Sequence, residues 1–191
     1  MKQIRKTITK AEIAAMPKVL FPGRIFVIYT ESEAEKAVAY LKDQRIVGVD
    51  TETRPSFKRG TTHKVALLQI STQDTCFLFR LNRIGMPDSL QEFLMSDTLK
   101  IGLSLKDDFN SLRKREDVHP DRGNWIELQD YVGRFGIADR SLQKNLRQFV
   151  WPEDFKKASV FPIGSGGAQR GTETICSHGC VGLCGNLQLP D

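Results

Sequence analysis

The sequence predicts a single α/β domain in which helices flank a mixed central sheet. Short runs rich in β-branched and aromatic residues alternate with stretches whose apolar residues recur at helical spacing. Two of the strand-like runs also follow one another across a short polar turn, which indicates an antiparallel pair. The expected order is strand, helix, three strands, helix, strand and two helices, and 191 residues suffice to bury a core.

The elements before residue 54 follow from capping signals and residue types. A capping box at residues 9–12 predicts a short helix that ends near Pro17, and a β-branched, aromatic run predicts a strand at residues 25–29. A second capping box at residues 32–35 opens a helix with one apolar face. That face consists of Ala34, Ala37, Val38 and Leu41. A strand at residues 46–52 follows.

The elements after residue 64 continue the alternation. Strands are expected at residues 65–70, 76–81 and 99–103. Helices are expected from Pro87, at residues 106–115 and, after the cap Asn124, along a face formed by Trp125, Leu128, Val132 and Phe135. From Phe149 onward, scattered glycines without apolar periodicity predict an irregular tail.

The composition indicates a globular protein of a reducing compartment. No apolar run approaches the roughly 20 residues that a membrane span needs, and the basic start lacks the apolar core of a signal peptide. We therefore expect a cytoplasmic protein without membrane contact. Cys76 stands alone in the body of the chain. The spacing of Cys176, Cys180 and Cys184 is not a common zinc pattern, so we expect no zinc site there.

The strand at residues 46–52 ends in two carboxylates, Asp50 and Glu52, one residue apart. Alternate residues of a strand share a face, so these side chains should project side by side. Two like charges this close destabilise each other unless a cation neutralises them, and sites gather at strand ends in α/β sheets. The alternative is a solvated strand end, and the residues alone leave both interpretations open.

A third carboxylate follows the strand at residues 99–103, because Asp107 or Asp108 occupies the first turn of the next helix. A charge favoured by the helix dipole would explain either residue by itself. Together with Asp50 and Glu52, it suggests a hard divalent cation, Mg²⁺ or Mn²⁺. Two such ions can clamp the attacking and leaving oxygens of a phosphodiester.

The loop after Glu52 is basic, with Arg54, Lys58 and Arg59. Such side chains contact nucleic-acid phosphates, although an ordinary solvated loop explains them equally well. The net charge of +5 adds to the expectation of a polyanionic partner. We therefore expect nucleic acid as the partner, and the sequence indicates no protein partner.

Several segments, in order, resemble the DEDD-type 3′–5′ exonucleases, most of all their Werner-type and ribonuclease D-like branch. The similar segments are Val47 to Glu52, residues 54–70, residues 101–112 and residues 125–130, within a span of roughly residues 25–144. The resemblance implies a ribonuclease H-like three-layer fold, with the C-terminal helices missing from this chain. It also implies hydrolysis of terminal phosphodiester bonds at a single-stranded 3′ end of DNA or RNA, releasing nucleoside monophosphates.

The resemblance also implies roles for individual residues. Asp50 and Glu52 would bind two Mg²⁺ or Mn²⁺ ions, and Glu52 would also contact the terminal ribose. Asp108, and not Asp107, would hold the second ion. The expected catalytic and metal-binding residues are therefore Asp50, Glu52 and Asp108.

A third motif of this family, Tyr-x-x-x-Asp, does not occur in the chain: no aspartate stands four residues after any tyrosine. The tail offers an explanation, because codons for residues 175–188, read one base later, can spell Tyr-Ala-Ala-Thr-Asp and the helix around it. We hypothesise a one-base frameshift between about Lys144 and Phe149. Residues 1–144 would then be the exonuclease domain and residues 145–191 an out-of-frame tail, in which the clustered cysteines are accidents of frame.

Lys58, Arg59 and Gln69 are the expected substrate contacts, through phosphate or terminal-nucleotide hydrogen bonds. For Gln69 the alternative is a strand residue with a satisfied amide. Two other functions remain open. One is a catalytically impaired nucleic-acid-binding remnant, because units of this kind lose most activity when one member is missing. The other is a generic α/β binding domain whose acidic strand end is coincidental.

Overall fold

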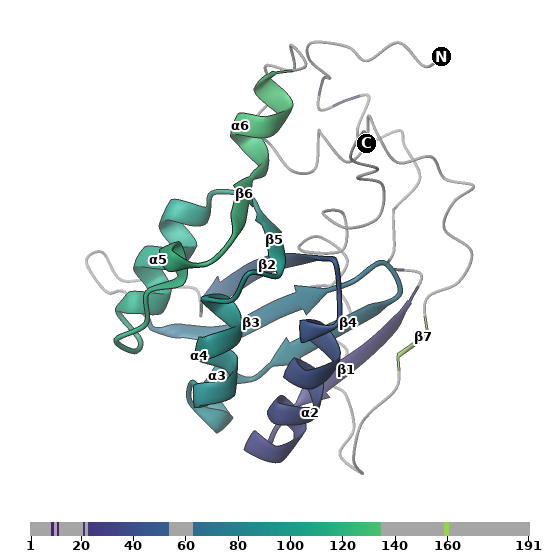
Figure 1. Ribbon diagram of the computed structural model, residues 1–191, viewed down its shortest axis with the longest axis vertical. Helices are drawn as coiled ribbons and strands as arrows, with labels where there is room; N and C mark the ends of the chain where they lie inside the picture. The colour runs from purple at the N-terminus through teal and green to yellow at the C-terminus, as the bar shows by residue number, and fades with distance from the viewer. Residues whose placement is uncertain are drawn as a thin grey trace.

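The computed structural model describes Thr9, Ala11, Phe21 and residues 23–53, 63–134 and 159–160 (Figure 1). These residues form an α/β fold around one seven-stranded mixed sheet with the strand order β6-β5-β2-β3-β4-β1-β7. Among the described strands, β3 alone runs antiparallel to its neighbours, since every other pair is parallel. The predicted α/β class with a mixed sheet is confirmed.

The described part of the chain alternates strands and helices. The strands are β1 (Arg24–Ile28), β2 (Ile46–Thr53), β3 (Val65–Ser71), β4 (Thr75–Phe79), β5 (Leu99–Gly102), β6 (Trp125–Glu127) and β7 (Ser159–Val160). The helices are α2 (Glu31–Lys42), α3 (Leu81–Ile84), α4 (Asp88–Leu94), α5 (Leu105–Arg113), the 3₁₀ turn η1 (Pro120–Arg122) and α6 (Leu128–Gly133). None of the helices in these ranges is long and apolar enough to cross a membrane.

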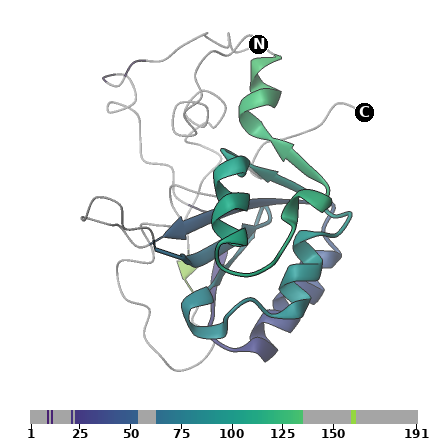
Figure 2. The same cartoon turned by 90° about the vertical axis from the view of Figure 1, so that its left-hand side faces the viewer.

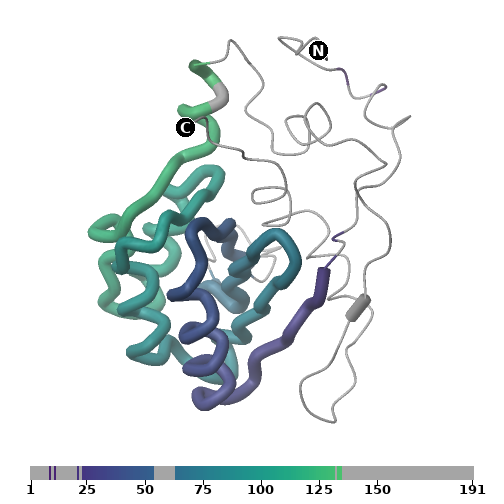
Figure 3. The backbone as a smooth tube through the Cα atoms, turned by 45° about the vertical axis from the view of Figure 1, so that its right-hand side comes forward, coloured from purple at the N-terminus to yellow at the C-terminus, as the bar shows by residue number. Residues whose placement is uncertain are grey.

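The main core fills the space between one face of the sheet and a layer of helices. Figures 1 and 2 show α2 and α4 side by side against this face, whereas α6 extends away from the end of the sheet, as Figure 3 also shows. The sheet contributes Val47, Val49, Leu68 and Phe79 to this core. The predicted apolar face of α2 is confirmed: Ala34, Ala37, Val38 and Leu41 are all buried.

Helix α2 begins two residues earlier than predicted. The capping box is formed by Thr30 and Glu33: the Thr30 hydroxyl accepts the Glu33 N–H at 3.3 Å, and the Glu33 carboxylate accepts the Thr30 N–H at 3.1 Å. Two overlapping quartets, residues 30–33 and 32–35, fit the same pattern. The extended backbone of Thr30, with φ −129° and ψ 157°, makes it the residue that precedes the first turn.

The last predicted helix is wrong over residues 125–127, which form the strand β6 and pair in parallel with β5. Its apolar residues pack like those of a strand, and the helix α6 begins only at Leu128. Leu81, predicted to end a strand, opens the short helix α3 instead. The antiparallel pair β3–β4 and the helix at α4 are confirmed.

Some predictions fall on parts of the chain that the structure leaves undescribed. The first predicted helix lies there apart from Thr9 and Ala11, as does the basic loop with Arg54, Lys58 and Arg59. The same holds for Phe135 and, apart from residues 159–160, for the tail from residue 145. The division at residue 144 therefore stays a prediction.

Candidate active site

The candidate site lies where three neighbouring parallel strands end. Strands β2, β5 and β6 are adjacent, and Gly48 pairs with Ile101 as Gly102 pairs with Glu127. Because these strands run in the same direction, their carboxyl ends meet at one edge of the sheet. This edge brings together the acidic end of β2, the turn that opens α5, and the last residue of β6.

Asp50 and Glu52 come from the end of β2 and influence each other electrostatically. Burial raises the pKa of the Asp50 carboxyl to about 6, and the Glu52 charge adds to this effect, while a backbone hydrogen bond at Thr51 opposes it. Glu52 is exposed, and partial desolvation raises the pKa of its carboxyl. Both carboxyls belong to β2, where alternate residues project from the same face.

Asp108 joins the end of β2 through Thr51. The Thr51 hydroxyl donates a hydrogen bond to Oδ1 of Asp108. Burial raises the pKa of Asp108 to about 7; the Thr51 hydrogen bond lowers it, and the Asp50 charge raises it further. Asp107, one residue earlier in α5, is exposed. Of the two carboxylates that open this helix, Asp108 is therefore the one that lies against β2.

The turn between β5 and α5 depends on two unusual backbone positions. Ser104 has φ 64° and ψ 34°, a left-handed conformation that side chains other than glycine rarely adopt. A Cβ at Gly102 would lie 2.0 Å from Cδ2 of Leu105, so the absence of a side chain lets the helix return close to the strand. The chain can therefore reverse within two residues and present the first turn of α5 to β2.

Glu127 holds this turn from the neighbouring strand. Its Oε1 accepts the N–H of Ser104 at 3.1 Å, and its Oε2 accepts the N–H of Leu105 at 2.8 Å. Gln129 donates its N–H to the same carboxylate at 3.0 Å and its side-chain amide to the Ser104 hydroxyl at 3.2 Å. Sequence reasoning missed Glu127, because it assigned residues 125–127 to a helix. An acidic residue ending a strand beside a strand–helix turn was the available signal.

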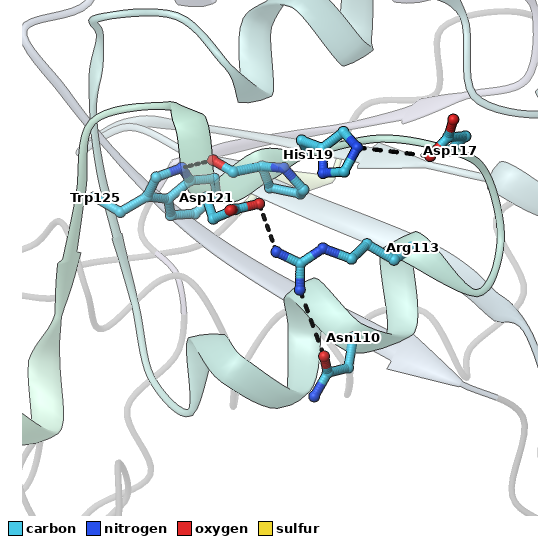
Figure 4. Close-up of polar contacts among 7 residues, drawn as sticks. Asn110, Arg113, Asp117, His119, Asp121 and Trp125 are labelled. Atoms are coloured by element: carbon cyan, nitrogen blue, oxygen red, sulfur yellow. Dashed lines mark hydrogen bonds and ion pairs between the residues drawn. The ribbon is translucent and has the colours of Figure 1, made fainter.

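Helix α5 is also fixed at its other end (Figure 4). Arg113 donates to Asp121 at 2.5 Å and to Asn110 at 3.5 Å, and the indole of Trp125 donates to the Pro120 carbonyl at 2.7 Å. In the same view, Nε2 of His119 lies 3.6 Å from Oδ1 of Asp117. The helix that carries Asp108 is therefore tied to η1, and η1 in turn is tied to β6.

Arg115 connects this end of α5 with the sheet. Its guanidinium donates to the carbonyl of Val65 at 2.7 Å and to the carbonyl of Leu81. Burial lowers the pKa of this guanidinium. Because Val65 opens β3, the strand opposite β2, Arg115 fixes the position of α5 relative to the strand pair that carries the acidic residues.

Of the expected substrate contacts, only Gln69 is described. It lies on β3 directly opposite Asp50, and it is fully buried. Residues paired in this way across antiparallel strands project from the same face. Gln69 is therefore a neighbour of the acidic pair, within the sheet and away from solvent.

Two pairs of described carboxylates, Asp50 with Glu52 and Asp50 with Asp108, carry the negative charge that a divalent cation would neutralise. Asp50 is coupled to Glu52 and to Asp108, so an ion bridging either pair would relieve charge repulsion. Within residues 23–53 and 63–134, however, no three His, Cys, Asp or Glu side chains form a cluster that could hold an ion.

Known proteins match this region of the chain. A family model described as 3′–5′ exonuclease matches residues 25–146. A 3′–5′ exonuclease of Arabidopsis thaliana is 31% identical over 117 residues, which are 54% of this chain and 41% of that protein. The bifunctional 3′–5′ exonuclease/ATP-dependent helicase WRN of Mus musculus is 29% identical over 122 residues, 60% of this chain and 9% of that protein. The chain thus spans less than half of either relative.

Solved structures show the same fold. The EXD2 exonuclease domain, soaked in Mg and GMP, superimposes with a TM-score of 0.50 at 22% identity, covering 59% of this chain and 60% of that one. RNase D of Trypanosoma brucei, in complex with RNA U12, does so with a TM-score of 0.50 at 21% identity, covering 59% of this chain and 40% of that one. These likenesses confirm the predicted ribonuclease H-like fold.

Proposed function

The chain belongs to the 3′–5′ exonuclease family, and on that premise we propose that it hydrolyses the terminal phosphodiester bond of nucleic acid with the help of divalent cations. The substrate would be a single-stranded 3′ end, and the products nucleoside monophosphates. The observation that carries the proposal is the hydrogen bond from Thr51, which lies between Asp50 and Glu52 at the end of β2, to Asp108 in the first turn of α5. Half-buried carboxyls with raised pKa values, gathered at one sheet edge, are typical of cation-binding and catalytic sites.

Asp50, Glu52 and Asp108 would hold the ions, Mg²⁺ or Mn²⁺. A bound ion of this type supplies Lewis-acid stabilisation of charge on phosphodiester oxygens. The chain contributes orientation: the Thr51 hydroxyl fixes one oxygen of Asp108, and Glu127 and Arg113 fix the helix that carries it. Raised pKa values mean that protons compete with cations for these carboxyls below neutral pH.

Other observations support a nucleic-acid substrate. The chain carries a net charge of +5, which favours polyanions. Structures with a similar fold include one soaked in Mg and GMP, one soaked in Mn and one in complex with RNA. We propose Lys58 and Arg59 as contacts to the phosphates or the terminal nucleotide of the bound strand, whereas the full burial of Gln69 favours the alternative of a structural strand residue.

A second candidate is a nucleic-acid-binding remnant with impaired catalysis. Two observations favour it: the described residues contain no three-residue metal cluster, and Tyr29, Tyr40 and Tyr131 lack an aspartate four residues later. Such a protein would bind single strands without shortening them. Hydrolysis therefore has to be measured separately from binding.

The test uses 5′-labelled single-stranded DNA and RNA, incubated with the protein in Mg²⁺, in Mn²⁺ or in EDTA. We expect stepwise shortening from the 3′ end in either metal and none in EDTA. Asp50→Asn and Asp108→Asn should abolish it, whereas Asp107→Asn, which makes the same charge change one residue away, should retain at least half of the rate. Binding without shortening in the unchanged protein would favour the remnant, and equal shortening by Asp108→Asn would exclude the proposed site.

A further inference from the structure

We propose that Glu127 is a positioning residue, which sets the place of Asp108 by clamping the turn at Ser104. The inference rests on the proposed function, since it concerns a residue that supports the metal-binding carboxylate without binding metal or substrate itself. Nothing in the sequence patterns assigned a role to Glu127. Its contacts, the backbone conformation beside it and the hydrogen bonds of α5 carry the argument.

The contacts of Glu127 form a two-pronged clamp. Each carboxylate oxygen accepts one backbone N–H of the turn, at 3.1 Å from Ser104 and at 2.8 Å from Leu105. Hydrogen bonds to a charged acceptor are about twice as strong as neutral ones. The two N–H groups of the turn point at different oxygens of Glu127, so a glutamine held in the same orientation would present its NH₂ group to one of them and lose that hydrogen bond.

The turn that Glu127 holds is one that needs support. Ser104 is the only described residue other than glycine with a positive φ, at 64°. A strained backbone of this kind persists only where the surroundings fix it, and such positions cluster at functional sites. Glu127 supplies the fixing contact together with Gln129, whose amide donates to the Ser104 hydroxyl at 3.2 Å.

The clamp reaches Asp108 in one further step. The Ser104 carbonyl accepts the N–H of Asp107 at 2.9 Å and that of Asp108 at 3.5 Å, so the clamped residue is also the one that opens the first turn of α5. On the opposite side, the Thr51 hydroxyl donates to the Asp108 carboxylate. Glu127 thus fixes the backbone that leads to Asp108, and Thr51 fixes the carboxylate of Asp108.

A carboxylate in this place also has an electrostatic cost. The charge of Glu127 disfavours ionisation of Asp108 and acts in the same direction as the charges of Asp50 and Asp107. A glutamine would avoid this repulsion but would face one of the two N–H groups with its NH₂ group. A bound cation would offset the repulsion, and the negative potential of Glu127 would then favour cation binding. The clamp and the proposed metal site are therefore compatible.

The experiment compares Glu127→Gln, Glu127→Asp and Glu127→Ala with Asp130→Asn, an exposed carboxylate three residues later that makes the same charge change as Glu127→Gln. The first readout is the Mn²⁺ dissociation constant without substrate, measured by electron paramagnetic resonance. The second is the thermal unfolding midpoint in EDTA, and the third is kcat and KM on a single-stranded oligonucleotide. We expect Glu127→Gln, while folded at the assay temperature, to weaken Mn²⁺ binding at least tenfold and to lower kcat more than it raises KM.

A rescue variant separates positioning from general stability. Ser104→Gly lets the turn adopt its left-handed conformation without support, so it should restore part of the Mn²⁺ affinity when added to Glu127→Gln. If Glu127→Gln weakened Mn²⁺ binding only by loosening the fold, adding Ser104→Gly would not restore the Mn²⁺ affinity. If Glu127→Ala does not fold, the near-isosteric Glu127→Gln and its double variant decide the matter.

The outcomes distinguish this inference from the proposed function. Mn²⁺ affinity within twofold of the unchanged protein in a folded Glu127→Gln, together with loss of binding in Asp108→Asn, would overturn the positioning role and leave the function standing. Unchanged Mn²⁺ binding in Asp108→Asn, or no binding by the parent chain, would overturn both. Loss of affinity in Glu127→Gln with recovery in the double variant would establish the role.

Discussion

At the scale of single residues, Thr51 links two carboxylates that lie 58 positions apart in the chain, Asp50 and Asp108. It stands between the two acidic residues of β2, and its hydroxyl turns to the helix that follows β5. The sequence identified the carboxylates because their charges stand out against a buried strand. The hydroxyl between them gave no signal, because threonine is common in strands.

We expect Thr51→Val to weaken Mn²⁺ binding by about tenfold or more. Valine has nearly the same shape and favours a strand, so the change removes little besides the hydrogen bond to Asp108. A hydrogen bond to a charged group contributes about 1.5–3 kcal/mol, which corresponds to a factor of ten or more in a binding constant. Thr51→Ser keeps the hydroxyl and is the matched control. Isothermal titration with Mn²⁺ measures both, and equal affinities would show that the hydroxyl does not orient Asp108.

The raised pKa values predict how the stability of the metal-free protein varies with pH. Burial raises the pKa of Asp50 to about 6 and that of Asp108 to about 7, from ordinary values near 4, so between pH 4 and 7 the folded state binds more protons. The free energy of unfolding therefore falls as pH rises through this window, on the order of 1–3 kcal/mol for each group. Asp74 and Asp121, whose pKa values are lowered, act in the opposite direction but below pH 4.

Thermal unfolding in EDTA at pH 5 and pH 8 measures this effect. The unchanged protein should lose stability between the two pH values, and Asp108→Asn, which cannot ionise, should lose clearly less. Saturating Mg²⁺ should remove most of the loss at pH 8. A loss of the same size in Asp108→Asn would assign the pH dependence to other groups.

At the scale of elements, the carboxyl ends of β2, β5 and β6 form the site, and β6 is the one that sequence analysis assigned wrongly. Residues 125–127 have apolar spacing that also suits a helix continuing through α6. Pairing with the edge of β5 decides the outcome, and this tertiary contact cannot be read from local spacing. The same three residues include Glu127, so the wrong assignment of this element hid the side chain that we propose as a positioning residue.

Lys100 on β5 shows how the loop before this strand is held. It is fully buried, and its ammonium donates to the carbonyls of Ser96 and Thr98, each at 2.8 Å, while it lies over the rings of Phe93 and Trp125. Burial lowers the pKa of this lysine to about 8. The ammonium therefore connects the end of α4 with the start of the strand that leads to the site.

We expect Lys100→Met to lower the free energy of unfolding by about 1–3 kcal/mol. Methionine fills most of the volume but removes the ammonium donor from two part-buried carbonyl oxygens, of which that of Ser96 keeps the N–H of Asn124. Urea denaturation measures the change, and Lys36→Met, on the exposed side of α2, is the control that should change stability by less than about 0.5 kcal/mol. A Lys100→Met protein as stable as the control would show that the ammonium contacts are dispensable.

At the scale of the whole molecule, sequence analysis predicted the class, the sheet and most elements between residues 24 and 115. Those predictions succeeded because local periodicity or a capping residue indicates each element, as Thr30 and the buried face of α2 show. The relation between Asp108 and β2 could not be derived from periodicity. It depends on the crossover from β5 to α5. The positions of the carboxylates at strand ends suggested that they belong together, and only the resemblance to a family selected Asp108 rather than Asp107.

The frameshift hypothesis makes a prediction about the complete domain. Restoring the alternative reading frame after Lys144 would supply the Tyr-x-x-x-Asp motif that the present sequence lacks. We expect such a protein to shorten single-stranded substrate at least a hundredfold faster than the present chain, since catalytic units lose most of their activity when one member is absent. Resequencing the gene establishes which frame is natural. Equal rates for the two proteins would show that the motif is not needed.

Strand β3, the one antiparallel strand among the described residues, has a consequence for how the site assembles during folding. Strands β2, β3 and β4 follow one another in the chain, so Asp50, Glu52 and Gln69 come together by pairing between near neighbours. Asp108 arrives only when β5 pairs with β2 across about 50 residues, and such non-local contacts form late and slowly. A cation that bridges Asp50 and Asp108 would then act after the rate-limiting step of folding. It would prolong the lifetime of the native state without speeding its formation.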